Sequence, residues 1–284
     1  MIECWKLCLK DNGKYEQELH RRIDFGNIDS VTKQLPKGGY TTFRTYKLEK
    51  ALRFDDHIQR LLKTAELSNV DVNIDQRTIR ETIRSVIGEN KNRNLDSRIR
   101  IIVDFEKEIG DVYIIVDKLK VLADTHYEVG VQVVTNDNIT RMNPKAKLTS
   151  FIEETKMVRD NLPETINEIL LIDHMGYVTE GMTSNFFAIM DAKIYTSNRS
   201  ILNGITRDIV LSVIKNKRIP MSFQPLYEKE LNNIQEAFLT SSSRGVLPIR
   251  NINDVQIGEG GLGKITEVIR KETSTKILNE IERI

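Results

Sequence analysis

A single carboxylate and a helix start are the parts of this chain that most suggest chemistry. Glu180 follows the β-like stretch Tyr177–Thr179, and a turn at 202–204 leads into an amphipathic helix that begins near Ile205. The free backbone N–H groups of a helix start, helped here by the hydroxyl of Thr206, form a site for an anion. A carboxylate and an anion site at one sheet edge predict a ligand with a cationic ring and a phosphate.

Two further stretches could take part in the same chemistry. Residues 241–245, Ser-Ser-Ser-Arg-Gly, offer hydroxyls and N–H groups in a tight turn after a strand, although an ordinary solvated turn explains them equally well. A lysine amine is the remaining option for covalent catalysis, and Lys145 and Lys147 lie just before or at the start of a helix predicted over 147–161. Composition alone does not choose one of the many lysines.

Other kinds of site find little support. The four histidines are scattered, and no serine or cysteine has the surroundings of a nucleophile elbow, which argues against a hydrolytic triad and a metal hydrolase. The segment 258–265 nearly fits a phosphate-binding loop, but Ile265 replaces the hydroxyl residue that should hold magnesium. A glycine-rich turn into the last helix is the better interpretation, and no metal is expected at the site.

Length, charge and cysteine content limit the class of protein. The 284 residues suffice for two domains, and 42 Lys and Arg against 41 Asp and Glu leave a net charge of +1, so nucleic acid is not an expected partner. Cys4 and Cys8 have no Cys or His cluster near them, which excludes a disulfide framework and a structural zinc site. Without a long apolar run or a signal peptide, a cytoplasmic protein with no membrane contact is expected.

The elements that position these residues fall into two groups. Residues 1–120 are predicted to form a small α+β domain, 121–127 a linker, and 128–284 a large cofactor-binding domain. The residues before 38 look irregular apart from a short strand at 4–9. The predicted strands are 40–46, 51–54, 98–103, 112–116, 129–135, 169–172, 177–179, a run from 186, 219–223, 237–240 and 247–249. One helix is predicted to begin after Asp55 or Asp56, which serves as its cap. The other predicted helices cover 75–87, 147–161, a stretch from 206, and 264–284.

The order of these motifs resembles that of a known family. A lysine before a helix is followed by LLIDHMGYVTEGMTSNFF, LNGITRDIV and EAFLTSSSRGVLPI. This series resembles the class IV aminotransferases, the pyridoxal-phosphate enzymes of fold type IV that include branched-chain and D-amino-acid aminotransferases and aminodeoxychorismate lyase. The resemblance covers most of the chain from about Gly39. It implies an α+β fold of two domains, a small α/β N-terminal one and a larger C-terminal one with a central mixed, β-barrel-like sheet flanked by helices.

The resemblance also implies roles for individual residues. Lys147 resembles the lysine that forms a Schiff base with pyridoxal 5′-phosphate and then acts as general base and acid, with Lys145 as the alternative. Glu180 resembles the carboxylate that pairs with the pyridine nitrogen. The residues matched to the cofactor phosphate are Arg60, Ile205, Thr206 and Ser242. Those matched to the substrate are Ser243 and, on strands of the small domain, Tyr40, Arg44 and Arg100. The wider set of candidates on these strands is Tyr40, Phe43, Arg44, Arg98 and Arg100. Because side chains alternate along a strand, only some of these five can face the cleft.

The expected activity is transamination between a branched-chain, aliphatic or D-amino acid and a 2-oxo acid. The alternatives are a 4-amino-4-deoxychorismate lyase, which releases pyruvate and 4-aminobenzoate, and a protein that keeps the fold without turnover. The chain departs from the branched-chain pattern at Phe151 and Ile152, where Asn-Tyr is usual, and at Arg244 and Gly245, where a small residue and glutamate are usual. These differences bear on specificity rather than on the cofactor. The family also implies a homodimer.

Overall fold

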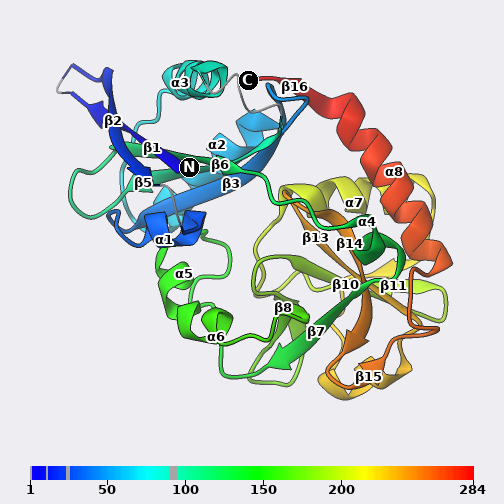
Figure 1. The fold of residues 1–284 in the computed structure, drawn as a ribbon. Helices are drawn as coiled ribbons and strands as arrows, with labels where there is room; N and C mark the ends of the chain where they lie inside the picture. Colours follow the sequence, from blue (N-terminus) through cyan, green and yellow to red (C-terminus); the bar gives the residue numbers. More distant parts are fainter. Residues whose placement is uncertain (1, 11, 24–25, 90–94) are drawn as a thin grey trace. The chain divides into compact units, whose positions relative to one another are not determined.

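The structure is a computed structural model that describes residues 2–10, 12–23, 26–89 and 95–284 (Figure 1). The chain folds into two compact units. Unit 1 consists of Met1–Lys120, Ala146–Lys156 and Glu280–Ile284, and unit 2 of Val121–Lys145 and Met157–Asn279. Two later segments therefore join the N-terminal part, and the continuous domain ranges predicted from the sequence do not include them.

Unit 1 is built on one antiparallel sheet of seven strands in the order β16-β4-β3-β5-β6-β1-β2. The strands of this sheet come from several separate stretches of the sequence. The elements of the unit are β1 (Ile2–Leu9), β2 (Tyr15–Ile23), α1 (Ile28–Thr32), β3 (Gly38–Tyr46), β4 (Lys50–Leu52), α2 (Phe54–Leu67), α3 (Gln76–Glu89), β5 (Ser97–Asp104), β6 (Val112–Lys118), α5 (Ser150–Glu154) and β16 (Ile281–Arg283).

The two faces of this sheet are covered by different helices. Helices α2 and α3 lie on one side of the sheet and α1 on the other (Figure 1). Phe43 of β3 lies in a buried cluster with Ile58 of α2 and Ile79 of α3, whereas Tyr40 lies in a second cluster with Ile28 of α1. Successive residues of a strand point to opposite faces, so β3 supplies both clusters. Phe43 is therefore on the face opposite to Tyr40 and belongs to the core beneath α2 and α3. The alternation predicted from the sequence separates these two residues.

The N-terminal residues are more regular than predicted. β2 pairs with β1 and α1 follows, where the sequence suggested an irregular segment before residue 38. Because β2 is an edge strand with a single neighbour, it lacks the apolar alternation that identifies a covered strand.

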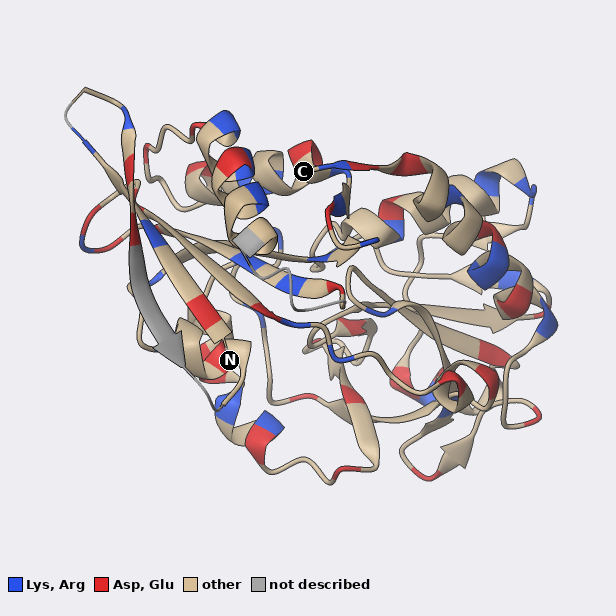
Figure 2. Ribbon diagram, turned by 45° about the horizontal axis from the view of Figure 1, so that its top comes forward, with Lys and Arg blue, Asp and Glu red and all other residues tan. Residues whose placement is uncertain are grey.

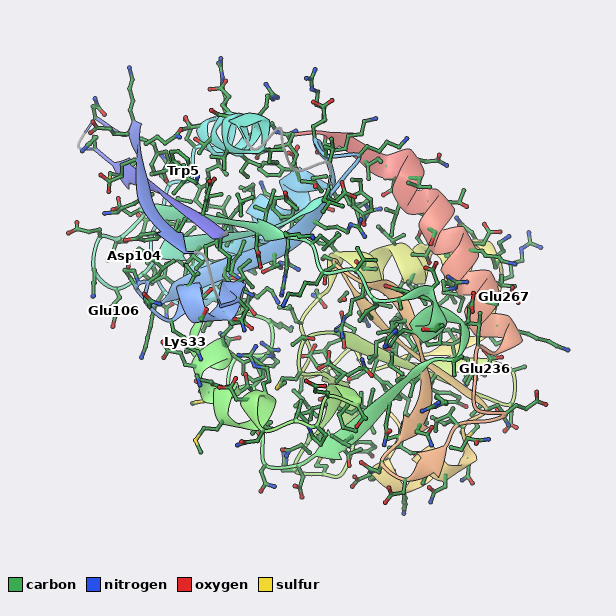
Figure 3. The ribbon with its side chains drawn as sticks, in the orientation of Figure 1. Trp5, Lys33, Asp104, Glu106, Glu236 and Glu267 are labelled. Carbon is green, nitrogen blue, oxygen red and sulfur yellow. The ribbon has the colours of Figure 1, made fainter. Side chains whose placement is uncertain are left out.

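Figure 3 marks Trp5 of β1 and Asp104 at the end of β5. The Asp104 carboxylate accepts hydrogen bonds from the N–H groups of Glu106, Lys107 and Glu108 in the turn before β6.

The predicted cap of α2 is wrong. The helix begins at Phe54 with Arg53 as N-cap, in the left-handed backbone region and without a side-chain cap. Asp55 and Asp56 lie inside the first turn instead, where their charges favour the positive end of the helix dipole. The helix predicted over 75–87 forms as α3 and extends through Glu89, the last described residue before position 95.

The single helix predicted over 147–161 is also wrong. Two five-residue helices, α5 and α6 (Lys156–Asp160), replace it, and Lys147 precedes both. Residues 147–149 pair with the start of β3, because the carbonyl of Lys147 accepts from Tyr40 N–H at 2.8 Å and Thr149 N–H donates to Gly38 at 2.9 Å. Helical periodicity in the sequence does not register this long-range pairing. At the end of α5 the hydroxyl of Thr155 bonds the carbonyl of Phe151 at 2.6 Å, a side-chain bond that competes with continued helix.

Unit 2 is built on a mixed sheet whose strand path is β12-β11-β10-β13-β14-β7-β8-β9, with β15 paired to β14. The pairs β11–β12, β14–β7 and β7–β8 are parallel, and the others are antiparallel. The elements are α4 (Asp124–Glu128), β7 (Val131–Asn136), α6, β8 (Ile166–Ile172), β9 (Val178–Gly181), β10 (Asn185–Met190), β11 (Lys193–Tyr195), α7 (Ile205–Asn216), β12 (Met221–Ser222), η1 (Glu228–Asn233), β13 (Glu236–Ser241), β14 (Gly245–Ile252), β15 (Val255–Gln256) and α8 (Lys264–Glu280).

A short connection shows that this sheet is curled. Only residues 182–184 join β9 to β10, although four strands lie between these two in the strand path. In a flat sheet, five neighbour spacings would separate them by about 24 Å. The chain from Gly181 to Asn185 can span about 14 Å at most. The sheet must therefore bend round until its β9 end meets β10, which is the barrel-like curvature that the sequence prediction included.

Helices α7 and α8 cover one face of the curled sheet. Val210 and Ile214 of α7 and Ile269 of α8 pack in a buried cluster with Phe187 and Phe238, whose rings stack at 4.8 Å. Both helices are apolar on the side that meets these rings, so burial of this face positions the start of α7.

Glu236 of β13 determines how α8 begins. Its two carboxylate oxygens accept from the N–H groups of Ile265 and Thr266 at 3.1 and 2.7 Å, and Figure 3 shows Glu236 close to the start of this helix. A Cβ at Gly263 would lie 2.0 Å from the Glu236 carboxyl carbon, so this approach requires glycine. The glycine-rich segment is thus a turn into α8. The first N–H groups of α8 already bond an anion, the Glu236 carboxylate. The helix ends at Glu280 rather than Ile284, because 281–283 form β16 and pair with β4.

Candidate active site

Glu180 lies in β9 and is 2% exposed. Arg141 donates to Oε1 at 3.1 Å, and Oε2 accepts from the Asn185 amide at 3.1 Å and from Leu202 N–H at 3.0 Å. A buried carboxylate is costly unless it is paired and hydrogen-bonded, and these three donors provide both. The arrangement leaves an anionic group fixed inside unit 2.

The turn before α7 is tied to the same carboxylate. The Asn185 amide also donates to the carbonyl of Leu202 at 2.8 Å. A Cβ at Gly204 would lie 2.2 Å from the Asn185 side-chain oxygen, so only glycine permits this close approach. Asn185 therefore holds the 202–204 turn beside Glu180. The carboxylate and the helix start that the sequence singled out are close neighbours in unit 2.

The start of α7 has the properties of an anion site. Its N-cap is Gly204, which has no side chain to cap the first N–H groups, and no side chain of the described residues is found to do so. Thr206, in the first turn, is 2% exposed, and its hydroxyl is buried without a hydrogen-bond partner among the described residues. A buried hydroxyl left without a partner costs about 1–3 kcal/mol. A phosphate, with several acceptor oxygens, would satisfy both this hydroxyl and the N–H groups.

The serine turn connects β13 to β14 in the same unit. Ser241 pairs with Gly245, whose φ of +66° favours glycine, and Ser242 and Ser243 lie in the turn between them. One strand position earlier, Thr240 pairs with Asn185, and the Thr240 hydroxyl is buried without a partner among the described residues. The sequence prediction did not include Thr240. Its only signal is its position directly before the serine run.

Unit 1 carries the candidate lysine. Lys147 is half-buried, whereas Lys145 is exposed. The Lys147 Nζ lies 4.6 Å from the ring centroid of Tyr40, and its backbone N–H donates to the Thr64 hydroxyl at 3.2 Å. Contacts from α2 and β3 thus fix both the backbone and the amine of this residue. The structure distinguishes Lys147 from Lys145, which composition could not do.

Arg60 of α2 is held by two neighbours. Its Nη2 donates to the Thr41 hydroxyl at 2.5 Å and lies 3.2 Å from Nδ1 of His57, and these two partners are 2.7 Å apart. Burial of His57, together with the positive charges of Arg60 and Lys147, lowers its pKa well below the ordinary value. The imidazole is therefore neutral at neutral pH and can accept a hydrogen bond beside two cations.

Arg100 is 3% exposed and is engaged inside unit 1. It donates to Asp29 of α1 at 2.7 Å, to Thr32 at 2.7 Å and to Thr42 at 3.0 Å, and it lies 5.0 Å from the Tyr40 ring. These contacts fasten α1 to the sheet.

Arg44 is engaged in a similar way. It donates to Asp96 at 2.8 Å and stacks on Tyr46 at 4.7 Å. Both Arg44 and Arg100 therefore already have a carboxylate partner, and their contact with substrate stays a prediction.

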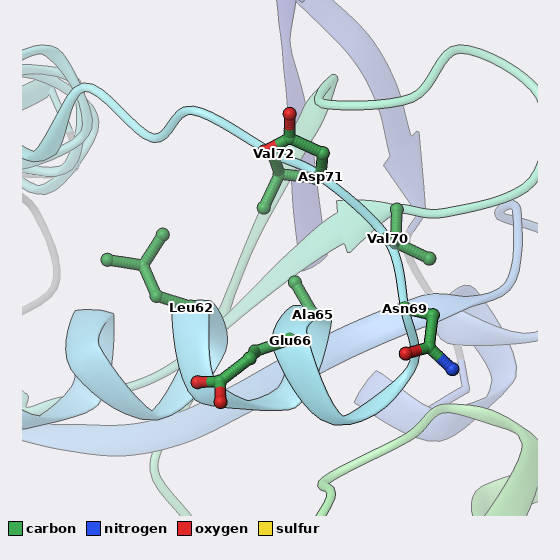
Figure 4. Close-up of a pocket in the computed structure, with 7 residues that line it drawn as sticks. All are labelled: Leu62, Ala65, Glu66, Asn69, Val70, Asp71 and Val72. Carbon is green, nitrogen blue, oxygen red and sulfur yellow. The ribbon is translucent and has the colours of Figure 1, made fainter.

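Unit 1 has a pocket that is separate from the predicted site residues. It is found at the C-terminal end of α2 (Figure 4), and none of the predicted site residues lines it. Its lining residues are Leu62, Ala65, Glu66, Asn69, Val70, Asp71 and Val72. Nothing in this lining suggests catalysis.

Charged residues of both signs are spread over each unit. Basic and acidic residues alternate along the ribbon of each unit rather than forming a field of one sign (Figure 2). Within the described ranges, no group of three or more His, Cys, Asp or Glu side chains could hold a metal ion. Of the helices in the described residues, none is both long and apolar enough to cross a membrane.

Sequence reasoning missed two residues, Asn185 and Arg141, whose side chains contact Glu180. Arg141, in the loop before the candidate lysine, was not singled out, because a lone arginine in a polar loop carries no periodic or motif signal. Its importance follows only from the 3.1 Å pair with Glu180, in which the two side chains are 8% and 2% exposed.

Comparisons with known proteins identify the family. A family model described as Amino-transferase class IV matches residues 38–252. The branched-chain-amino-acid aminotransferase of Pseudomonas aeruginosa is 27% identical over 251 residues, covering 82% of this chain and 80% of its own. The D-alanine aminotransferase of Staphylococcus epidermidis is 26% identical over 286 residues, covering 92% and 94%.

A solved structure shows the same fold. The PLP-bound form of a hypothetical aminotransferase from Mycobacterium tuberculosis superposes with a TM-score of 0.76 at 17% identity, covering 97% of this chain and 99% of that one. The α+β fold class predicted from the sequence is thereby confirmed. The match over residues 38–252 also confirms the resemblance noted from the motifs, and the chain belongs to the class IV aminotransferases.

Proposed function

We propose that this protein is a pyridoxal-phosphate-dependent transaminase that moves an amino group between an amino acid and a 2-oxo acid. Its family, and relatives named as branched-chain and D-alanine aminotransferases, support this reaction class. The observation that carries the cofactor is the buried hydroxyl of Thr206, which has no hydrogen-bond partner among the described residues and lies in the first turn of α7. It lies close to a buried carboxylate that suits a cationic ring, since Asn185 bonds both Glu180 and the 202–204 turn.

The residues that would hold the cofactor follow from this fit. Ile205 and Thr206 would bind its phosphate through N–H groups and a hydroxyl, with Ser242 and Arg60 as further donors. Glu180, fixed by Arg141, would hold a proton at the ring nitrogen. Bound pyridoxal phosphate supplies an electron sink for the charge that develops at the substrate α-carbon.

Lys147 would have two tasks. Its amine would hold the cofactor covalently at rest, and once released it would take the proton from the substrate α-carbon and return it later. Its fixed backbone and its contact with Tyr40 support this role by limiting where the amine can lie. Ser243 would bind the substrate carboxylate, with Tyr40, Arg44 and Arg100 as further substrate-binding candidates.

The test begins with the purified protein loaded with pyridoxal phosphate. Borohydride reduction followed by peptide mass spectrometry should place the reduced cofactor on Lys147. Lys147→Ala should lose the visible absorbance band, whereas Lys145→Ala should keep it. A label on another lysine overturns the assignment, and a protein that never acquires a band overturns the function.

Substrate choice is tested separately. We propose a branched-chain, aliphatic or D-amino donor, since both kinds of relative are named in the comparisons. A panel of L- and D-amino acids, added without acceptor, should convert the cofactor to its amine form with only one stereochemical series. Pyruvate released from 4-amino-4-deoxychorismate without an acceptor would support the lyase instead.

Assembly and location are further parts of the proposal. A cytoplasmic homodimer is expected for this family. Analytical ultracentrifugation of the loaded protein checks the dimer, and a single monomeric species would contradict it.

A further inference from the structure

Arg244, in the serine turn, joins three separate segments of unit 2. It donates to the Glu168 carboxylate of β8 at 2.8 Å and to the Thr183 hydroxyl, in the connection between β9 and β10, at 2.9 Å. It also donates to the Ser241 hydroxyl at 3.2 Å and to the carbonyl of Asn167 at 3.4 Å. One guanidinium thus joins the end of β13, strand β8 and the connection between β9 and β10.

The ion pair with Glu168 holds the Arg244 side chain in place. The carboxylate is 2% exposed and accepts from the hydroxyls of Thr183 and Ser184 as well as from Arg244. Arg244 is its only cationic partner among the described residues. A buried carboxylate that loses its cation is strongly unfavourable, so the pair holds the arginine side chain in one position.

The backbone of the same residue is also anchored. The hydroxyl of Tyr127, in α4, donates to the Arg244 carbonyl at 3.0 Å. Side chain and carbonyl are therefore fixed from two directions. Residues 242–244 form the whole turn between β13 and β14, so fixing Arg244 also limits the movement of Ser242 and Ser243.

The 182–184 connection, which Arg244 contacts through Thr183, leads directly into another site residue. Thr183 and Ser184 directly precede Asn185, which bonds Glu180. A guanidinium that bonds Thr183 and the serine turn together therefore sets the distance between two segments of the cofactor site. The unpartnered Thr240 hydroxyl lies on the strand between them, because Thr240 pairs with Asn185.

We propose that Arg244 is a positioning residue that fixes the Ser242–Ser243 turn against the 182–184 connection for binding of the cofactor phosphate and the substrate carboxylate. This inference rests on the proposed function. Because Glu168 neutralises its charge, Arg244 acts through geometry and not by attracting anions. Its removal should weaken binding more than it slows the chemical step at saturating substrate.

The test compares Arg244→Gln and Arg244→Lys with Arg250→Gln as a matched control. Arg250 lies on β14, the strand that follows the serine turn, is exposed, and its side chain bonds Asn251. For Arg244→Gln we expect the dissociation constant of pyridoxal phosphate and the KM for the amino donor each to rise about tenfold, from loss of a charged hydrogen bond. The rate at saturating donor should change less than the KM does. Arg244→Lys should recover part of the affinity, and Arg250→Gln should match wild type.

A double variant separates positioning from charge. If Arg244 acts through its pair, Glu168→Gln combined with Arg244→Gln should bind no more weakly than the worse single variant. Fully additive losses would contradict this. If Arg244→Gln does not fold, Thr183→Val, which removes one acceptor, should still raise both constants about threefold.

Two failures are distinguishable. A folded Arg244→Gln protein with wild-type dissociation constant and KM overturns the inference and leaves the proposed function intact. A wild-type protein that does not bind pyridoxal phosphate overturns the function itself.

Discussion

The side-chain amide of Asn185 lies 3.1 Å from a carboxylate oxygen of Glu180, and both side chains are buried. The same amide donates to the carbonyl of Leu202, so one residue at the start of β10 joins the carboxylate to the turn before α7. The spacing between the two ends of the candidate cofactor site in unit 2 depends on this contact.

Asn185→Ala should destabilise the protein and weaken its binding of pyridoxal phosphate. The change leaves a buried carbonyl and part of a buried carboxylate without a donor, at a cost of about 1–3 kcal/mol for each. Urea unfolding of the cofactor-free protein measures the free energy. Asn138→Ala, at an exposed position, is the control. Equal stability of the two variants would contradict the role given to Asn185.

Gly204→Ala should be poorly tolerated because of the same contact. The new Cβ would meet the Asn185 oxygen at 2.2 Å, so the turn or the amide must shift. The control is Gly88→Ala in α3, where a Cβ meets nothing within 4 Å. That change should stabilise by about 0.5–1 kcal/mol, since alanine is favoured within a helix. Combining Gly204→Ala with Asn185→Ala should cost less than the sum of the two single changes.

Arg141→Met should remove the cation that donates to Oε1 of the buried Glu180 carboxylate. A loss of about 3–5 kcal/mol in the free energy of unfolding is expected for a broken buried pair. Adding Glu180→Gln should restore most of that loss, because the uncompensated charge is then gone. Chemical denaturation of the four proteins in the cycle measures the coupling. A double variant no more stable than Arg141→Met would show that the pair contributes little.

His57 predicts how stability depends on pH. Burial and the charges of Arg60 and Lys147 lower its pKa in the folded state, whereas the unfolded chain has an ordinary pKa near 6.5. Below that pH the unfolded chain binds a proton that the folded protein does not, so stability falls as the pH decreases, by up to about 1.4 kcal/mol per pH unit.

The measurement is urea unfolding between pH 7.5 and 5, a range of roughly one unit above and 1.5 units below the ordinary pKa. His57→Gln should show a shallower decrease across that range than wild type does. The exposed His174 offers a control, and His174→Gln should keep the wild-type slope. Equal slopes for wild type and His57→Gln would mean that His57 does not titrate as proposed.

Several features of this protein follow from local sequence. The β8–β9 hairpin, the start of α7 near Ile205 and the turn at 241–245 were each expected, because a strand period, a helix period and turn residues are written in neighbouring positions. The alternation that separates Tyr40 from Phe43 is equally local. The motif order alone was enough to indicate the family.

Tertiary structure decided the rest. Lys147 precedes its helix instead of starting it, because residues 147–149 pair with β3, more than a hundred positions earlier. The polar strand β2 forms because β1 offers it an edge, and the partners of Arg141 and Arg244 depend on the curl that brings β9 to β10. Periodicity reports which face of an element is apolar. It does not report which distant segment that element meets, and for Arg141, Lys147 and Arg244 that meeting determines the candidate role.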